Sequence, residues 1–193
     1  MTKNRLEAFS DGVLAIIITI MVLEFKVPND TTFESVVKLS HKFLSYILSF
    51  IYVGIYWNNH HHLLQTAKNV NGKILWANLH LLFWLSLIPF TTAWIGEHHF
   101  ASFPMMLYGI ILMMNGIAFN ILQRTIIQHH GKDSVLYKAV GKDFKGKISV
   151  ILYLIAVFMT IYYPIVSGVI YIFVALMWLV PDKRIEQVLE NEK

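Results

Sequence analysis

A carboxylate, Asp11, stands near the start of an otherwise almost wholly apolar stretch that runs from Leu6 to Val27. An ionised side chain in hydrocarbon costs about 3 kcal/mol even on mild insertion scales, so it has a buried partner or a function. We expect it to belong to a buried polar cluster at the cytoplasmic end of the membrane that fixes the base of the first helix. The candidate members are Arg5, Ser10, Asp11, His60 or His61, Asn78 and His80.

Nine histidines and no cysteine leave imidazole as the main potential metal ligand. In the run His60-His61-His62, neighbouring side chains point about 100° apart on a helix, so the run lacks the i, i+4 pair of a helical zinc site. There is also no HExxH pattern. We interpret His98-His99 and His129-His130 as polar residues at the membrane surface, and we expect neither a metal site nor an enzyme.

The same apolar stretch carries a second pattern. At about 100° per residue, six residues fall within about 60° of Ile16, and Arg5 extends this stripe at its N-terminal end; Asp11 lies about 140° away. The stripe is either a helix packing face or, if several copies meet at an axis, a series of apolar rings that gate by dewetting. Its members are Phe9, Gly12, Ile16, Thr19, Ile20 and Leu23.

The composition and the apolar runs of the sequence predict the helices that carry these residues. Of the 193 residues, 56% are hydrophobic and 15% charged, and the mean hydropathy is +0.55, which is typical of a membrane protein. Pro164 and Gly168 divide the last apolar block into two short helices. We predict an all-α integral membrane protein with one domain over residues 1–193 and six transmembrane helices, at about 6–27, 39–57, 74–95, 103–127, 148–163 and 166–180.

Basic residues predict the orientation. Of the 16 Lys and Arg, only Lys26, Lys38 and Lys42 fall on the side opposite the N-terminus. Under the positive-inside rule, both termini are cytoplasmic and the protein is a multi-pass protein of the cell membrane. The net charge of +4 then reflects this bias, and we infer no nucleic-acid partner.

The element Arg5-x-x-x-Phe9-Ser10-Asp11, the segment Tyr56 to Leu63 and the segment Trp76 to Thr92 resemble the transmembrane protein 175 family. This family comprises the lysosomal potassium channels of animals and their bacterial relatives. The resemblance implies a homotetrameric potassium channel whose first helix lines the pore and whose signature residues, including Phe9, form a structural and gating network. It further implies a constriction at Ile16, Ile20 and Leu23, a hydroxyl layer at Thr19, and permeant potassium ions in place of a cofactor.

Two alternatives remain open from the residues. A proton-coupled secondary transporter would use Asp11 and His80 as a relay, although no internal repeat is visible. A membrane enzyme or scaffold is the other. The absence of a TVGYG segment excludes a potassium filter built from carbonyl cages, so selectivity in a channel would come from pore width, partial dehydration and nearby dipoles.

Overall fold

The computed structural model describes residues 2–131, 134, 136–137 and 143–179, which form helices and connecting loops with no β-strand among them. The helices are α1 (Lys3–Leu23), α2 (Phe33–Val37), α3 (Ser40–Gln65), α4 (Gly72–Ser86), α5 (Ile88–Glu97), α6 (Ser102–His130), α8 (Phe144–Met159) and α9 (Pro164–Leu179).

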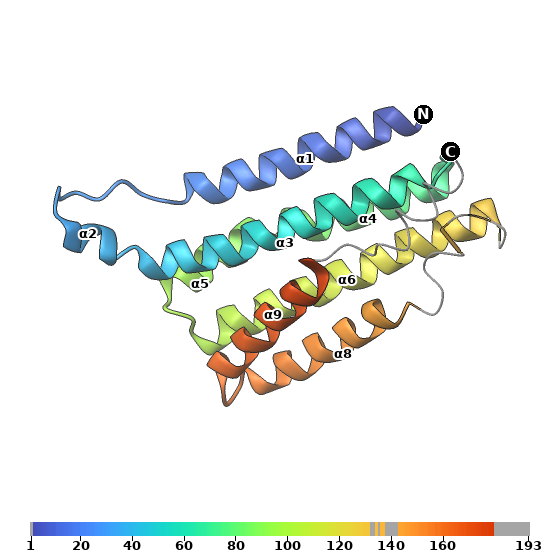
Figure 1. Cartoon of the computed structure of the whole chain (residues 1–193). Helices are drawn as coiled ribbons and strands as arrows, with labels where there is room; N and C mark the ends of the chain where they lie inside the picture. Colours follow the sequence, from blue (N-terminus) through green and yellow to red (C-terminus); the bar gives the residue numbers. More distant parts are fainter. Residues whose placement is uncertain (1, 132–133, 135, 138–142, 180–193) are drawn as a thin grey trace.

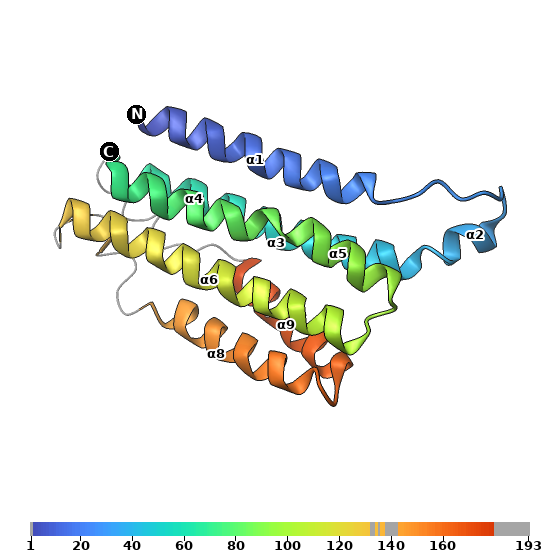
Figure 2. The same ribbon diagram turned by 180° about the vertical axis from the view of Figure 1, so that it is seen from behind.

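The long helices lie side by side and run up and down in a bundle (Figures 1 and 2). The helix α1 forms one edge and the α8–α9 hairpin the other, with α3, α4, α5 and α6 between them. The short helix α2 lies in the connection between α1 and α3. Each long helix turns its buried apolar residues towards its neighbours in the bundle.

One pass is made of two helices, because α4 ends at Ser86 and α5 begins at Ile88. Pro89 lacks a backbone N–H and cannot continue the hydrogen-bond ladder of α4. The hydroxyl of Thr92 donates to the carbonyl of Ile88 at 2.7 Å, one turn back within α5, whereas the carbonyl that loses its helical donor at Pro89 is that of Leu85. A proline inside an apolar span predicts a kink near the outer end of that span, and the interruption at Leu87 confirms it; the expected compensation of the freed carbonyl by Thr91 or Thr92 is not among the described hydrogen bonds.

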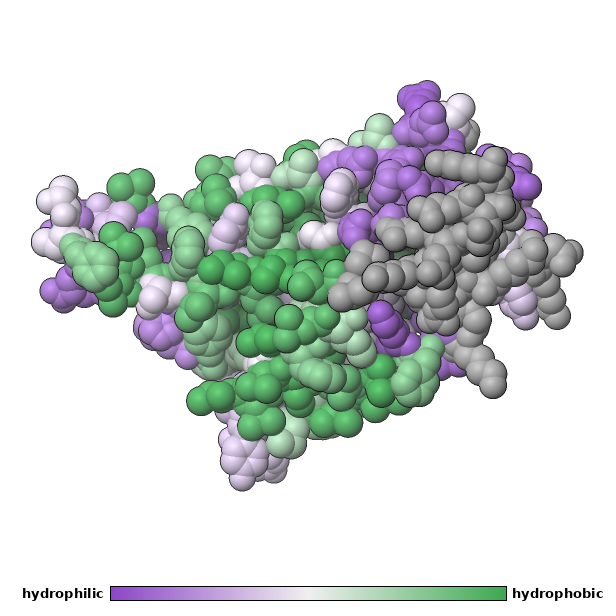
Figure 3. Space-filling view, viewed as in Figure 1, coloured by the Kyte–Doolittle hydropathy of each residue, from purple (hydrophilic) through white to green (hydrophobic). Residues whose placement is uncertain are grey.

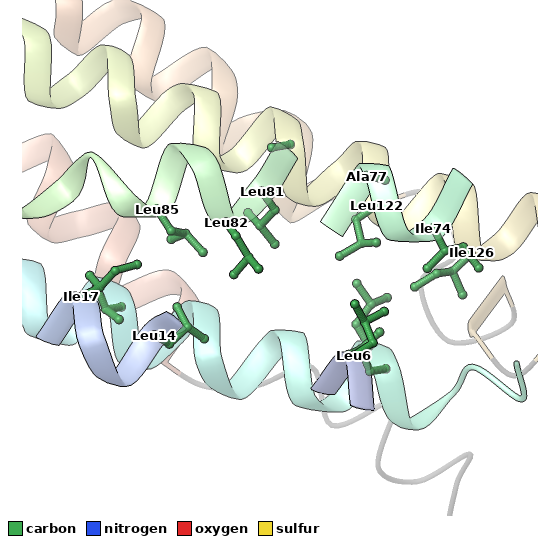
Figure 4. Close-up of a cluster of buried hydrophobic side chains, with 14 of the residues drawn as sticks. Leu6, Leu14, Ile17, Ile74, Ala77, Leu81, Leu82, Leu85, Leu122 and Ile126 are labelled. Carbon is green, nitrogen blue, oxygen red and sulfur yellow. The ribbon is translucent and has the colours of Figure 1, made fainter. Parts of the chain in front are cut away.

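Two buried clusters form the interior. The larger one joins α1, α3, α4, α5 and α6, and the smaller one joins α3, α5, α6, α8 and α9. Figure 4 shows Leu14 and Ile17 of α1 pointing towards Leu81, Leu82 and Leu85 of α4. The helix α1 is therefore attached to the bundle through one apolar face.

The outer surface matches a membrane environment. Figure 3 shows hydrophobic side chains across the middle of one face, with hydrophilic ones gathered towards the two ends of the bundle. Within the described residues, three segments are long and apolar enough to cross a bilayer, namely Lys3–Leu23, Gly72–Glu97 and Ser102–His130, and Pro164–Leu179 is a shorter apolar helix. The protein is thus all-helical with several apolar spans.

Candidate functional site

The helix α1 has two distinct faces. Its buried face consists of Leu6, Ser10, Leu14, Ile17 and Met21, which recur every three or four residues and pack against the bundle. The stripe that the sequence singles out lies on the other side. There the exposed fractions of Ile16, Ile20 and Leu23 are 59%, 42% and 72%. The stripe is therefore not the surface by which α1 packs within its own chain.

The polar and small members of the stripe are exposed as well. Arg5, Phe9, Gly12 and Thr19 all lie on this open side. The hydroxyl of Thr19 donates to the carbonyl of Ala15 at 2.9 Å. Its proton is thus used within the helix, which leaves the oxygen as an acceptor on the exposed face.

On the buried face, a hydrogen-bonded chain joins three helices. Ser10 of α1 donates to the carbonyl of Leu6 at 2.9 Å and accepts a hydrogen bond from the Nδ2 of Asn78 in α4 at 3.0 Å. The Oδ1 of Asn78 lies 2.7 Å from the Nε2 of His60 in α3. Ser10 and Asn78 are fully buried and His60 is 2% exposed.

This chain fixes the tautomer of His60. An amide oxygen only accepts, so the Nε2 of His60 carries the proton and donates it to Asn78. The other ring nitrogen, Nδ1, is buried and has no hydrogen-bond partner in the part of the chain that the structure describes. The neutral imidazole therefore joins α3 to α1 through Asn78 without a buried charge.

A second set of polar contacts lies along the flank of α1 that faces α3. The Nζ of Lys3 donates to the carbonyl of Gln65 at 3.1 Å, the Nδ1 of His61 lies 2.6 Å from Glu7, and the Nε1 of Trp57 donates to Asp11 at 3.0 Å. Successive partners are four residues apart on both helices and run in opposite directions. We call this set the α1–α3 ladder; it fixes the register of two antiparallel helices.

The expected cluster is therefore corrected in three respects. Asp11 is partly exposed and pairs with Trp57, because it lies about 100° around α1 from the buried Ser10. His80 accepts a hydrogen bond from Trp84 of its own helix at 3.0 Å, because its position is about 200° around α4 from Asn78. Arg5 is exposed on the stripe. Ser10, Asn78 and His60 do come together.

Sequence reasoning missed Glu7, Trp57 and the other rungs of the α1–α3 ladder. A signal was available, because Lys3, Glu7 and Asp11 follow each other at intervals of four and so share one flank of a helix. Their partners on α3 could not be assigned without the packing of the two helices.

The histidines at the end of α6 hold a loop in place. The Nε2 of His130 accepts a hydrogen bond from the backbone N–H of Lys68 at 3.1 Å, and the Nε2 of His129 lies 2.7 Å from the Oδ1 of Asn69. Both contacts reach the connection between α3 and α4. Across the described ranges, no three His, Cys, Asp or Glu side chains gather as potential metal ligands.

Comparison with known proteins identifies the family. The family model described as "Endosomal/lysosomal potassium channel TMEM175" matches residues 5–89, the segment from the Arg5 motif to Pro89. A potassium channel of Chryseobacterium sp. (strain P1-3) is 58% identical over 191 residues, which cover 99% of this chain and 100% of the relative. The chain belongs to the TMEM175 family. A TMEM175 relative of Chamaesiphon minutus, named a potassium channel, is 34% identical over 62% of this chain and 63% of its own length.

The fold agrees with the TMEM175 assignment. The crystal structure of a lysosomal potassium-selective channel TMEM175 homolog from Chamaesiphon minutus superposes with a TM-score of 0.80 at 28% identity, covering 93% of this chain and 97% of that one. An animal relative, the endosomal/lysosomal proton channel TMEM175 of Gallus gallus, is 30% identical over 65% of this chain but only 25% of its own length. The bacterial and animal TMEM175 relatives thus carry names with different permeant ions.

Proposed function

We propose that this protein is a potassium-permeable channel that conducts ions passively across the cell membrane. Support comes from the TMEM175 family and from bacterial relatives named potassium channels. The observation that carries the pore assignment is the open face of α1, where Ile16, Ile20 and Leu23 contact no other part of the bundle closely enough to be buried. The proposed activity needs no cofactor, and the ligands are the permeant ions.

The pore is formed by several copies of α1. One exposed helix face cannot enclose a conduit, but closed rotational symmetry supplies the other walls. We propose a homotetramer in which Ile16, Ile20 and Leu23 form apolar rings over about 10 Å along the axis. Such rings restrict ions because water is held poorly between aliphatic side chains. The acceptor oxygen of Thr19 forms a polar layer between the rings.

The α1–α3 ladder and the Ser10–Asn78–His60 chain position this helix. Both sets hold the cytoplasmic half of α1, whereas the outer half is held mainly by apolar contacts of Ile17 and Met21. We propose that this network sets the diameter of the constriction and is not itself a selectivity filter. Potassium preference then arises from pore width and partial dehydration.

The whole chain, residues 1–193, forms one six-helix domain in this proposal. The passes are α1, α3, the α4–α5 pair, α6, α8 and α9, and both termini lie in the cytoplasm. The distribution of Lys and Arg supports this orientation. The chain makes four of these passes between the N-terminus and the end of α6. In Figure 1, both points lie at the same end of the bundle, as an even number of passes requires.

Ion flux from purified protein tests the function. In planar bilayers with potassium on one side and sodium on the other, we expect a current whose reversal potential is shifted towards the equilibrium potential of potassium. A proton-coupled transporter instead requires a proton gradient or moves protons with each ion. The relay proposed for that alternative lacks support, because the described contacts pair Asp11 with Trp57 and His80 with Trp84. Strict dependence of potassium flux on a pH gradient would overturn the channel proposal.

Cross-linking tests the assembly. The chain contains no cysteine, so Ile16→Cys introduces a single thiol on the proposed axis. Oxidation in membranes should give disulfide-linked dimers, because neighbouring copies bring these thiols together. Phe158→Cys on α8, at an exposed position far from α1, is the matched control and should stay monomeric. Equal cross-linking of both variants, or none at Ile16→Cys, would contradict an axis lined by α1.

A further inference from the structure

A cavity lies between α3, α6, α8 and α9, in the part of the bundle away from α1. It holds about 520 Å³ of empty space when its open mouth is included. From α3 it is lined by Tyr56 and Asn59, among others. By helix geometry these side chains point to the side of α3 opposite to Trp57 and His61 of the α1–α3 ladder.

Two polar side chains in this cavity lack protein partners. Among the described residues, neither the hydroxyl of Tyr56 nor the amide of Gln123 makes a hydrogen bond, although Gln123 is only 7% exposed. Both groups line the same cavity, so a hydrogen-bonding occupant of the cavity can pair with both of them.

Further hydrogen-bonding capacity comes from two asparagines. The Nδ2 of Asn59 donates to the carbonyl of Ile55 at 2.8 Å, and the Nδ2 of Asn120 donates to Asp143 at 2.6 Å. In both amides the oxygen remains as an acceptor. Asp143 also caps α8 through the N–H of Gly146 at 3.1 Å, so its carboxylate is already partnered.

The other walls are aromatic and flat. The rings of Tyr56 and Phe119 lie edge to face with centroids 6.2 Å apart, and those of Phe119 and Trp178 with centroids 6.4 Å apart. The indole N–H of Trp178 is occupied by Ser149 at 2.8 Å. These rings make this side of the cavity apolar and aromatic, while the hydroxyl of Tyr56 and the amide of Gln123 offer hydrogen bonds.

We propose that this cavity, which we call the α3–α6 pocket, binds a small planar heteroaromatic molecule that carries hydrogen-bonding groups along one edge. The aromatic side chains pack against its ring, and Tyr56, Asn59 and Gln123 bind its polar edge. Tyr56 and Asn59 alternate along α3 with Trp57 and His60, which hold α1. The bound molecule thus stabilises the segment of α3 that anchors α1 and alters ion flux, and this second consequence rests on the proposed channel function.

Gly116 gives direct access to the pocket. It lines the cavity, and a Cβ placed there would meet Val150 and Tyr56 at ordinary contact distances of 3.9 and 4.0 Å. In the cysteine-free chain, Gly116→Cys provides one thiol for reversible capture of disulfide-bearing fragments. Gly54→Cys on α3 is the matched control, because its Cβ would meet nothing within 4 Å and it does not line the pocket.

The experiment compares three fragment classes by intact mass under competing 2-mercaptoethanol: aminobenzimidazole, cyclohexyl and trimethylammonium disulfides. We expect at least tenfold more capture of the aminobenzimidazole fragment at Gly116→Cys than at Gly54→Cys. Gln123→Leu in the Gly116→Cys background should reduce that capture at least fivefold without changing capture of the cyclohexyl fragment. Equal capture of the aromatic and cyclohexyl fragments, or no excess over Gly54→Cys, would overturn the proposal.

The mass measurement detects binding in a protein that conducts no ions. A failure of the binding proposal is therefore distinguishable from a failure of the proposed channel function. Potassium flux from liposomes containing the captured adduct then tests the coupling to α1. We expect the flux of the Gly116→Cys protein to change at least twofold on capture of the aminobenzimidazole fragment, relative to the same protein before capture. Capture without a change in flux would retain the site and refute its connection to α1.

Discussion

Replacing Asn78 by leucine tests whether the Ser10–Asn78–His60 chain holds α1 in place. Leucine has the same number of side-chain heavy atoms as asparagine but is apolar, so Asn78→Leu removes the hydrogen bonds to both neighbours. The Nε2 proton of His60 then has no acceptor, and its unprotonated Nδ1 has no donor among the described residues. One buried donor is therefore left unsatisfied.

The expected cost follows from that orphaned group. An unsatisfied buried donor costs about 1–3 kcal/mol. Hydrogen bonds in membrane proteins average only about 0.6 kcal/mol, because the unfolded chain in the membrane also finds partners. Asn78 makes two hydrogen bonds, so two average membrane values set a lower limit of about 1 kcal/mol for Asn78→Leu and the orphaned donor sets an upper limit of about 3 kcal/mol. Ser10→Ala leaves one N–H of Asn78 unpaired and should cost about 1 kcal/mol.

The double variant provides the sharper test. In Ser10→Ala with Asn78→Leu, the orphaned N–H of Asn78 no longer exists, so the two costs should not add. We expect a coupling energy of at least about 0.5 kcal/mol, typical of residues in one network. Reversible unfolding in mixed micelles, followed by far-UV circular dichroism, measures all three variants. Asn29→Leu, at an exposed position, is the control and should stay within about 0.5 kcal/mol of the unchanged protein.

Two results would refute this reasoning. If Asn78→Leu were as stable as the unchanged protein, the buried chain of hydrogen bonds would not exist as described. If the single costs simply added, Ser10 and Asn78 would act independently. Potassium flux of the stable variants then shows whether loosening α1 also alters conduction.

Further substitutions test the other contacts. Ile16→Asn should raise potassium current and weaken discrimination against sodium, because a polar side chain wets the ring, whereas Ile16→Leu should change little; unchanged bi-ionic reversal potentials and conductance in folded Ile16→Asn would remove Ile16 from the constriction. Asp11→Ala should lower the yield of assembled protein in size-exclusion chromatography more than it alters ion preference, because Asp11 accepts a hydrogen bond from Trp57; loss of permeation in fully assembled protein would instead place Asp11 in the pore. Gly109→Ala should cost about 1–3 kcal/mol of unfolding free energy, since its Cβ would collide with the hydroxyl of Tyr171, whereas Gly54→Ala, which meets nothing within 4 Å, should be tolerated; equal stability of the two would contradict the close approach of α6 and α9.

Helix positions follow from the sequence because they depend on local chemistry. The predicted segments 103–127 and 166–180 correspond closely to α6 and α9, since runs of apolar residues and the turn before Pro164 are readable over short distances. The end of the first helix was less predictable. The helix stops at Leu23 and not at the predicted Val27. Apolar residues continue past Leu23, and the first helix-breaking residue in the sequence is Pro28, so the sequence carried no signal for the earlier end.

The candidate site was partly predictable for the same reason. The 3.6-residue period places Ile16, Ile20 and Leu23 on one face whatever the neighbours are. The predicted spans place Ser10, Asn78 and His60 at the same end of their helices, and therefore at the same depth in the membrane. Depth could not separate Asn78 from His80, because helix rotation decides which of the two points inward.

By itself, the sequence determined the membrane character, the basic bias between the two sides, the stripe of α1 and the signature around Asp11, because each is a property of one segment or of composition. Tertiary structure alone decided that the stripe is open while Leu14 and Ile17 are buried, and that Asp11 pairs with Trp57 and leaves Ser10 to Asn78. It alone placed Tyr56 beside Gln123 in the α3–α6 pocket. The physical reason is that helical periodicity fixes which residues share a face, whereas the partner of that face depends on how helices distant in the chain rotate and pack against one another.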